Sequence, residues 1–223
     1  MSGDGFPLNH AAPVLCAGVL IGGQSSRMGN PKHLLAWRGR TLLESCLAAL
    51  YEVEELYQAR PQSTAQKFGK HHFSIYIIGA GELPEEVAHG ARIDDLPELS
   101  GPLSGVLAAR RLHPDSAWVF IACDHPWISR DAIRWLIAQR DNRHWTIIPR
   151  QCDGHPCPTF ALYEPPALRW LEACFADEGR KGLASLLDHP LTLTPYPPAE
   201  LAQAWRSANT PAELAAESER KQD

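Results

Sequence analysis

Strand-like and helix-like segments alternate along this 223-residue chain, and the alternation is the feature that most constrains its fold. Short apolar runs typical of strands cover residues 14–21, 73–78, 91–93, 118–123, 145–148 and 159–163. Helices are expected over residues 41–57, 104–112, 129–140, 166–175 and 181–187. Strands that alternate with helices favour a parallel sheet with helices on its faces. We therefore predict a three-layer α/β/α fold with a mostly parallel sheet.

Polar residues mark where several of these helices begin. Thr41 is followed three residues later by Glu44, which is a capping-box pattern. Ser129 is placed to cap the helix that follows it. Thr210 and Glu213 repeat the capping-box spacing near the C-terminus. These positions predict helix starts independently of the apolar pattern.

Length and composition indicate one globular domain. The chain is 44% hydrophobic and 21% charged, which is ordinary for a soluble protein. We expect the domain over residues 14–216, an N-terminal arm at residues 1–13 and a tail at residues 217–223. A net charge of -5 argues against a nucleic-acid surface. No apolar run approaches the roughly 20 residues that span a membrane, so no membrane partner is expected.

The N-terminus and the cysteines favour a cytoplasmic protein. Residues 1–13 are polar and lack a basic segment leading into an apolar core, so no signal peptide is expected. Several of the six cysteines lie in apolar runs, which suggests reduced, buried thiols. The cysteines are Cys16, Cys46, Cys123, Cys152, Cys157 and Cys174.

A glycine-rich loop over residues 22–32 follows the first predicted strand. Gly22 and Gly23 allow a sharp turn that presents backbone N–H groups to an anion. Arg27 and Lys32 add two positive charges within the same short loop. The glycine and lysine spacing matches neither a Walker A loop nor a dinucleotide fingerprint. The loop therefore predicts phosphate binding of another kind.

Asp124 follows the apolar strand at residues 118–123. Ligands of open α/β sheets bind beyond the carboxyl ends of the strands, where this carboxylate is expected. Mg²⁺ prefers oxygen ligands and shares them with substrate phosphates. The alternative role, a cap for the next helix, suits Ser129 better by position. Asp124 is therefore the predicted magnesium ligand.

Several motifs resemble the molybdenum cofactor guanylyltransferases and related nucleotidyltransferases. The loop pattern Leu20-x-Gly22-Gly23-x-Ser25-x-Arg27-Met28-Gly29-x-x-Lys32 carries the resemblance first. The segment from Gly101 to Gly105, after Asp94-Asp95, is similar to a stretch of that family that lies beside the nucleotide. Cys-Asp-His-Pro at residues 123–126 and the segment at residues 205–214 extend the resemblance over nearly the whole chain. It implies a Rossmann-like nucleotidyltransferase fold.

The resemblance implies Mg²⁺-dependent transfer of GMP from GTP to the phosphate of molybdopterin, with release of pyrophosphate. Other cofactor-biosynthesis proteins or a molybdoenzyme would be further partners. The implied catalytic residues are Arg27, Lys32 and Asp124, with Asp124 as the metal ligand. The implied nucleotide-binding residues are Leu20, Ile21, Gly22, Gly23, Lys32, Gly79, Asp95 and Asp124.

On the pterin side the resemblance implies Arg180 and Asn209. Arg180 opens a helix-like segment, where a cation opposes the helix dipole and suggests an anionic ligand. A solvated charge cluster is the alternative for Arg180. This chain departs from the family at Ser207 and Gly79, each of which stands where related enzymes carry an asparagine.

Other candidate sites have simpler explanations. The spacing of Cys152, His155 and Cys157 matches no common zinc motif, so a hairpin turn is expected. Cys123 ends an apolar strand and is predicted to be an inert buried thiol. His125 is expected only to line the site, because transfer to an ionised phosphate requires no strong base.

Three other functions remain open on sequence grounds. A sister cytidylyltransferase would use CTP with the same pterin, and a sugar-phosphate nucleotidyltransferase would use another acceptor. A non-catalytic nucleotide-binding or cofactor-carrier protein is the alternative from a different class. The presence of both Lys32 and Asp124 argues against a carrier, which needs neither a catalytic cation nor a metal ligand.

Overall fold

The computed structural model describes residues 14–22, 31–59, 73–178, 182–208 and 213–214. Seven strands form one sheet in the order β5-β4-β1-β6-β8-β7-β9. They are β1 (Leu15–Leu20), β4 (Phe73–Ile78), β5 (Arg92–Ile93), β6 (Ala117–Ala122), β7 (Thr146–Ile147), β8 (Phe160–Tyr163) and β9 (Thr192–Leu193). A separate hairpin joins β2 (Ala36–Trp37) to β3 (Arg40–Thr41).

The sheet is mostly parallel, as predicted. Strand β1 pairs in parallel with β4 and with β6, and β4 pairs in parallel with β5. Strand β8 is antiparallel to both of its neighbours, β6 and β7. It reverses because the chain between β7 and β8 folds back on itself, with Arg150 and Pro156 paired in antiparallel fashion, whereas a parallel pair needs a crossover.

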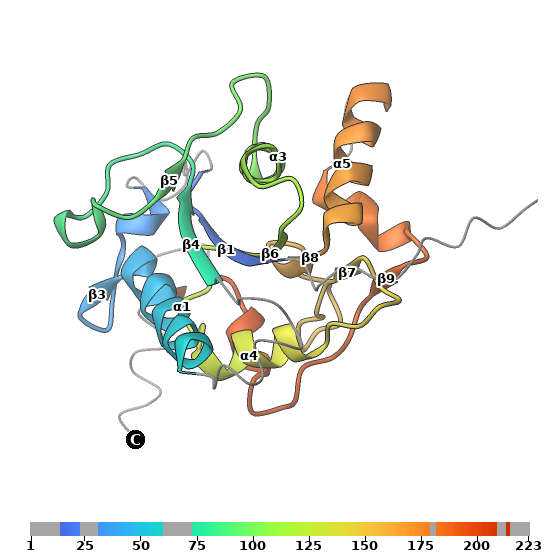
Figure 1. The fold of residues 1–223 in the computed structure, drawn as a ribbon. Helices are drawn as coiled ribbons and strands as arrows, with labels where there is room; N and C mark the ends of the chain where they lie inside the picture. Colours follow the sequence, from blue (N-terminus) through green and yellow to red (C-terminus); the bar gives the residue numbers. More distant parts are fainter. Residues whose placement is uncertain (1–13, 23–30, 60–72, 179–181, 209–212, 215–223) are drawn as a thin grey trace, which may run out of the picture.

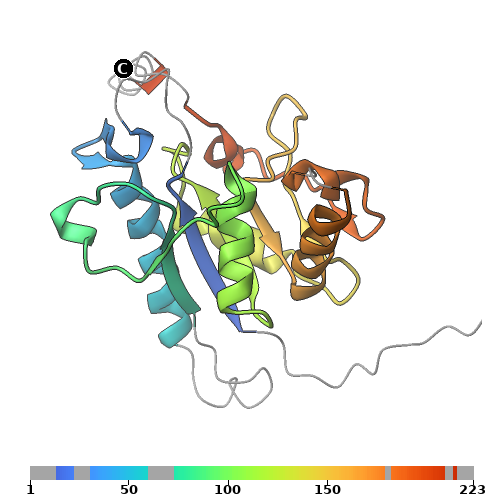
Figure 2. The same cartoon turned by 90° about the horizontal axis from the view of Figure 1, so that it is seen from above.

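Helices cover both faces of the sheet (Figure 1). Helices α1 (Leu42–Gln58) and α4 (Arg130–Ala138) lie on one face, and α3 (Pro102–Leu112) and α5 (Pro165–Glu178) lie on the other. Figure 2 shows the green α3 and the brown α5 in front of the strands. Alternate residues of β1 enter the two apolar layers: Val19 packs with α1 and α4, and Leu20 packs with α3. The predicted three-layer α/β/α fold is therefore confirmed.

Two predicted caps are present in the structure. The Thr41 hydroxyl accepts from the Glu44 backbone N–H at 3.2 Å, and the Glu44 carboxylate accepts from the Thr41 N–H at 2.6 Å. Ser129 Oγ accepts from the N–H of Ala132 at 3.3 Å and caps α4. The predicted starts of α1 and α4 are confirmed, because a cap needs only residues within one helical turn.

Other boundaries differ from the prediction. Helix α3 begins at Pro102 and not at residue 104, because Pro suits the first helical turn and Gly101, with φ of 73°, supplies the cap position. The predicted helix at residues 181–187 is a 3-10 helix, η3 (Leu183–Asp188). The hairpin of β2 and β3 was not predicted. None of the helices within the described ranges is long and apolar enough to cross a membrane.

Candidate nucleotide and metal site

Residues predicted to bind the nucleotide gather at one edge of the sheet. Gly22, Gly79 and Asp124 follow β1, β4 and β6. These strands are parallel neighbours, so their carboxyl ends meet at the same edge. Asp95 follows β5, the parallel neighbour of β4. The structure therefore places together residues that are far apart in the sequence.

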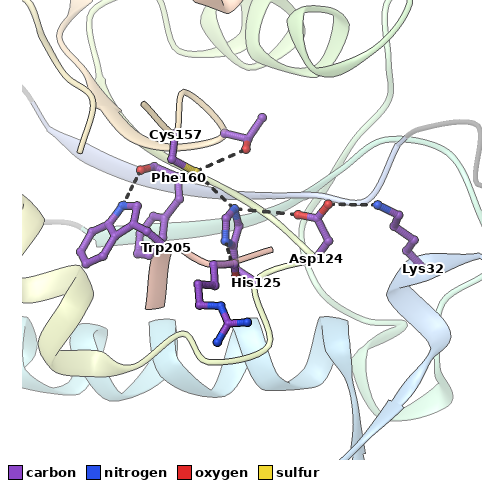
Figure 3. Close-up of polar contacts among 8 residues, drawn as sticks. Lys32, Asp124, His125, Cys157, Phe160 and Trp205 are labelled. Atoms are coloured by element: carbon purple, nitrogen blue, oxygen red, sulfur yellow. Dashed lines mark hydrogen bonds and ion pairs between the residues drawn. The ribbon is translucent and has the colours of Figure 1, made fainter. Parts of the chain in front are cut away.

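Lys32 and Asp124 form an ion pair at this edge (Figure 3). Lys32 Nζ lies 3.1 Å from Asp124 Oδ2, and the two side chains are 24% and 19% exposed. Lys32 begins the 3-10 helix η1 (Lys32–Leu34), whereas Asp124 lies in the turn after β6. Partial burial favours the pair, while the remaining exposure leaves both groups within reach of a ligand.

The Asp95 carboxylate lies in a space left by three glycines. A methyl group added at Gly22 would lie 2.9 Å from Asp95 Oδ2, and one at Gly79 or Gly105 would lie 3.3 Å from an Asp95 oxygen. Gly105 also brings α3 close to the sheet, since its methyl group would lie 2.7 Å from Ile78. Gly105 belongs to a motif noted in the sequence, but its contact with Asp95 was not predicted.

Gly79 has a backbone conformation that disfavours a side chain. Its φ is 119°, and an added methyl group would lie 2.8 Å from the backbone nitrogen of Gly22. A side chain therefore does not fit at this position without a change in the backbone. The Gly79 carbonyl accepts from Arg92 Nη2 at 2.8 Å and Nε at 3.1 Å. Arg92 thus holds this turn, a role that no sequence motif indicated.

Leu20 and Ile21 contribute to the edge through their backbone. Both side chains are buried, Leu20 in the layer with α3 and Ile21 in the layer with α1. The N–H of Ile21 donates to the carbonyl of Ile78 at 2.9 Å, and the carbonyl of Leu20 accepts from Cys123 at 3.1 Å. These bonds fix the end of β1, from which Gly22 continues toward the site.

His33 anchors Lys32 to the loop after β4. The His33 side chain is buried, and its Nε2 lies 2.7 Å from the carbonyl oxygen of Glu82. A carbonyl only accepts, so this nitrogen carries the proton. Gly81 makes room for the ring, because a methyl group there would lie 3.0 Å from His33. Sequence reasoning missed this anchor, since His33 belongs to no motif and contacts a residue distant in the chain.

His125 lies beside the Asp124 carboxylate, with Nε2 3.8 Å from Oδ1, and its role as a lining residue stays a prediction. Its side chain is buried, and Nε2 lies 3.6 Å from Cys157 Sγ. Burial alone would lower the pKa of His125, but the adjacent Cys157 sulfur and the Asp124 carboxylate raise it. Burial alone would raise the pKa of Cys157, but its contact with His125 lowers it. Cys157 therefore contacts His125 across the fold, an interaction that the predicted hairpin turn did not include.

The prediction that several cysteines are buried thiols is confirmed. Cys123 is buried, and burial together with the neighbouring Asp124 carboxylate raises its pKa to about 12. Cys152 is exposed whereas Cys157 is buried, so the two thiols face different environments. The turn between them is tight, because the N–H of Gln151 donates to the carbonyl of His155 at 2.8 Å. Cys16 and Cys46 are buried, and Cys174 is half-buried.

Four predicted site residues lie outside the described part of the chain. They are Gly23, Arg27, Arg180 and Asn209. The residues on either side of the glycine-rich loop are described: Gly22 lies beside Asp95, and Lys32 pairs with Asp124. The predicted cap at Thr210 lies outside the described ranges as well.

The Asp124 carboxylate suits a divalent cation that arrives with a nucleotide. Its Oδ2 already accepts a positively charged group, Lys32, and the side chain is partly exposed. Within the described ranges, no group of three or more histidine, cysteine or acidic residues could hold a metal ion. Mg²⁺ is commonly bound by one or two carboxylates together with substrate phosphates and water. The partly exposed Asp124 carboxylate is therefore a group that could hold a divalent cation together with substrate phosphates.

Comparison with known proteins identifies the family. Residues 17–193 match the family model described as the MobA-like NTP transferase domain. The chain belongs to this family. A probable molybdenum cofactor guanylyltransferase from Bacillus cytotoxicus is 27% identical over 177 residues, which cover 77% of this chain and 78% of the relative. A protein of the same name from Bacillus anthracis is 27% identical over 167 residues, covering 73% of this chain and 74% of the relative.

Solved structures share the fold. The molybdopterin-guanine dinucleotide biosynthesis protein A from Archaeoglobus fulgidus has a TM-score of 0.61 at 20% identity, covering 92% of this chain and 97% of that one. The 4-diphosphocytidyl-2C-methyl-D-erythritol synthase from Anaerococcus prevotii has a TM-score of 0.60 at 11% identity, covering 95% and 99%. Family membership makes the chain a nucleotidyltransferase, and the site at the sheet edge is where such chemistry is expected.

Proposed function

We propose that this member of the MobA-like family transfers GMP from GTP to the terminal phosphate of molybdopterin and releases pyrophosphate. The observation that carries the proposal is the Lys32–Asp124 pair, 3.1 Å apart at the carboxyl edge of parallel strands. The curated relatives called probable molybdenum cofactor guanylyltransferases support the choice of substrates.

The reaction suits residues that position and neutralise anions. The attacking phosphate oxygen is already ionised at neutral pH, so the site needs no strong general base. The barrier lies in bringing two anions together and in stabilising charge on the departing pyrophosphate. Gly22 and Gly23 would present backbone N–H groups to the triphosphate, and Arg27 would neutralise it. Lys32 would leave Asp124 for a phosphate oxygen when the nucleotide binds.

Asp124 would hold Mg²⁺, and the partly exposed carboxylate supports this assignment. When bound, the metal supplies positive charge beside the transferred phosphate. A cation held by Asp124 would weaken its ion pair with Lys32, which would free the Lys32 ammonium group for the substrate. Both groups would then place positive charge where the reaction develops negative charge.

Gly79 and Asp95 would contact the nucleotide near its base or ribose. An ionised carboxylate only accepts hydrogen bonds, so Asp95 would accept from ribose hydroxyls or from base N–H groups. Leu20 and Ile21 would frame the base through their backbone. Arg180 and Asn209 are proposed for the pterin side.

An assay of pyrophosphate release tests the proposal. The purified protein is incubated with Mg²⁺, molybdopterin and each nucleoside triphosphate in turn, and without the acceptor as a control. Release with GTP alone is expected. Release with CTP alone would instead identify a cytidylyltransferase. In a parallel set of incubations a sugar phosphate replaces molybdopterin, and release only in that set would indicate a sugar-phosphate nucleotidyltransferase. GTP binding without turnover in any pairing would indicate a carrier.

A further inference from the structure

The loop at residues 79–82 follows β4 at the edge of the sheet where Gly79 is proposed to contact the nucleotide. Gly79 and Gly81 have φ of 119° and 144°. Side chains rarely adopt such values, so the course of this loop depends on its glycines. Arg92 binds the carbonyl of Gly79 through two nitrogens and ties the start of the loop to β5. The end of the loop is held by a different element.

His33 holds the end of this loop in a closely fitted contact. His33 is 3% exposed, and its Nε2 donates to the carbonyl of Glu82 at 2.7 Å. A methyl group at Gly81 would lie 3.0 Å from Cε1 and 3.4 Å from Nε2 of the ring. The ring and the loop therefore fix each other's position, because a shift of either one breaks the hydrogen bond or creates a clash.

The same histidine fixes the position of η1, in which it follows Lys32 directly. A 3-10 helix of three residues has weak hydrogen bonds of its own and depends on contacts with the rest of the protein. The N–H of Leu35 donates to the Lys32 carbonyl at 3.0 Å, and the N–H of Leu42 donates to the Leu35 carbonyl at 2.9 Å. These bonds tie the end of η1 to α1, while His33 ties its middle to the loop after β4.

The backbone of η1 decides where the Lys32 ammonium group can reach. Lys32 Nζ lies 3.1 Å from Asp124 Oδ2 at the edge of the sheet (Figure 3). Lysine acts as a point charge on a flexible stem, so its attraction for an anion depends on the distance at which the backbone holds it. The loop at residues 79–82 and Lys32 thus lie on either side of one buried ring.

We propose that His33 is a positioning residue that couples the loop at residues 79–82 to Lys32. Its hydrogen bond to Glu82 holds η1 where the Lys32 ammonium group reaches the phosphates of the nucleotide. The contribution of Lys32 to nucleotide binding therefore depends on this bond. The inference rests on the proposed function for the role of Lys32 toward phosphate. It does not require His33 to touch a substrate or to transfer a proton.

A double-mutant cycle tests the coupling. The affinity for GTP with Mg²⁺ is measured by isothermal titration calorimetry for the wild type, Lys32→Ala, His33→Leu and the double variant. Lys32→Ala is expected to weaken binding by at least about tenfold, as removal of a hydrogen bond to a charged group does. His33→Leu should weaken binding nearly as much. The double variant should bind within about twofold of the weaker single variant, since residues that act independently would give additive losses.

Two further variants separate positioning from general stability. His33→Gln places an amide nitrogen near the position of Nε2, so it should restore both the GTP affinity and the effect of Lys32→Ala. Gly81→Ala disturbs the contact from the loop side and should reduce the effect of Lys32→Ala as His33→Leu does. Gly39→Ala is the matched control: its φ is 78°, but its methyl group meets nothing within 4 Å, so it should change neither quantity.

Equal costs of Lys32→Ala in the wild-type and His33→Leu backgrounds overturn the inference, because the two residues then act independently. A loss in Gly39→Ala as large as that in Gly81→Ala overturns it as well. Thermal melting confirms that each variant is folded, and the cycle is run with Gly81→Ala if His33→Leu is not.

The readout is binding, so its outcome is separate from that of the turnover assay. A protein that binds GTP without turnover refutes the proposed function, and the cycle still decides the role of His33. A protein that binds CTP and not GTP refutes the proposed nucleotide, and the cycle is then run with CTP. Absence of binding to every nucleoside triphosphate overturns both proposals.

Discussion

At the scale of single residues, the site depends on pairs that the fold brings together. Lys32 and Asp124 are 92 residues apart in the sequence, and His125 and Arg206 are 81 apart. Motif spacing identified Lys32 and Asp124 individually, because each belongs to a short pattern. No pattern identified the partners of His33 or His125, because those partners are reached only after the chain has folded.

Replacing either member of the ion pair is expected to stop the reaction without unfolding the protein. Asp124→Asn removes the negative charge that holds the metal, and Lys32→Ala removes a cation that neutralises the triphosphate. Each should lower kcat by at least about 10²-fold, the usual effect of removing a group that stabilises the transition state. Pyrophosphate release measures the activity, and circular dichroism melting measures the fold.

Asp115→Asn is the control for this pair of variants. Asp115 is exposed and lies just before β6, at the end of the strand opposite to Asp124. The same chemical change there should leave kcat unchanged. Wild-type activity in Asp124→Asn would remove Asp124 from the metal site.

At the scale of secondary-structure elements, capping residues predicted where helices begin, whereas apolar patterns predicted less accurately which short strands exist. The caps of α1 and α4 were correct because each cap involves residues three positions apart. The short strands β2, β3 and β9 were missed, whereas the equally short β5 and β7 lie within predicted apolar runs. The pairing direction of β8 follows from its connection to β7 and not from its own composition.

The capping box of α1 gives a prediction about stability and pH. Hydrogen bonds from the Thr41 backbone and side chain lower the pKa of Glu44. A lowered pKa in the folded state stabilises the protein above the unfolded pKa, and this contribution is lost as the pH falls through the folded pKa. Glu44→Gln should therefore destabilise the protein at pH 7 but match the wild type in acid. Urea unfolding at both pH values measures the difference.

Thr41→Ala removes the other half of the box and should lower the free energy of unfolding by about 1 kcal/mol. Glu55→Gln, on the exposed surface of the same helix, is the control for the loss of a carboxylate. A destabilisation by Glu44→Gln that persists unchanged in acid would contradict the role of the ionised carboxylate.

At the scale of the whole molecule, one sheet joins the two apolar layers. Strands β1 and β6 send alternate side chains into each layer, so neither layer forms without the same strands. The single domain predicted over residues 14–216 should therefore unfold in one transition. Leu50→Ala in one layer and Leu107→Ala in the other remove fully buried side chains.

Each of these two substitutions should lower the free energy of unfolding by about 2–5 kcal/mol and shift the same transition. Chemical denaturation followed by far-UV circular dichroism and by tryptophan fluorescence tests this expectation. Two transitions, of which each variant shifts only one, would show that the layers unfold independently.

The sequence by itself determined the order of the main strands and helices, two of the helix caps and the family motifs around Lys32 and Asp124. These features depend on residues within a few positions of one another, where capping and periodicity act. Only the tertiary structure decided that Asp95 lies against Gly22, Gly79 and Gly105, and that His125 joins Asp124 to the segment at Arg206. Those contacts arise from the packing of α3 and of the C-terminal segment against the sheet, and no local pattern encodes such packing.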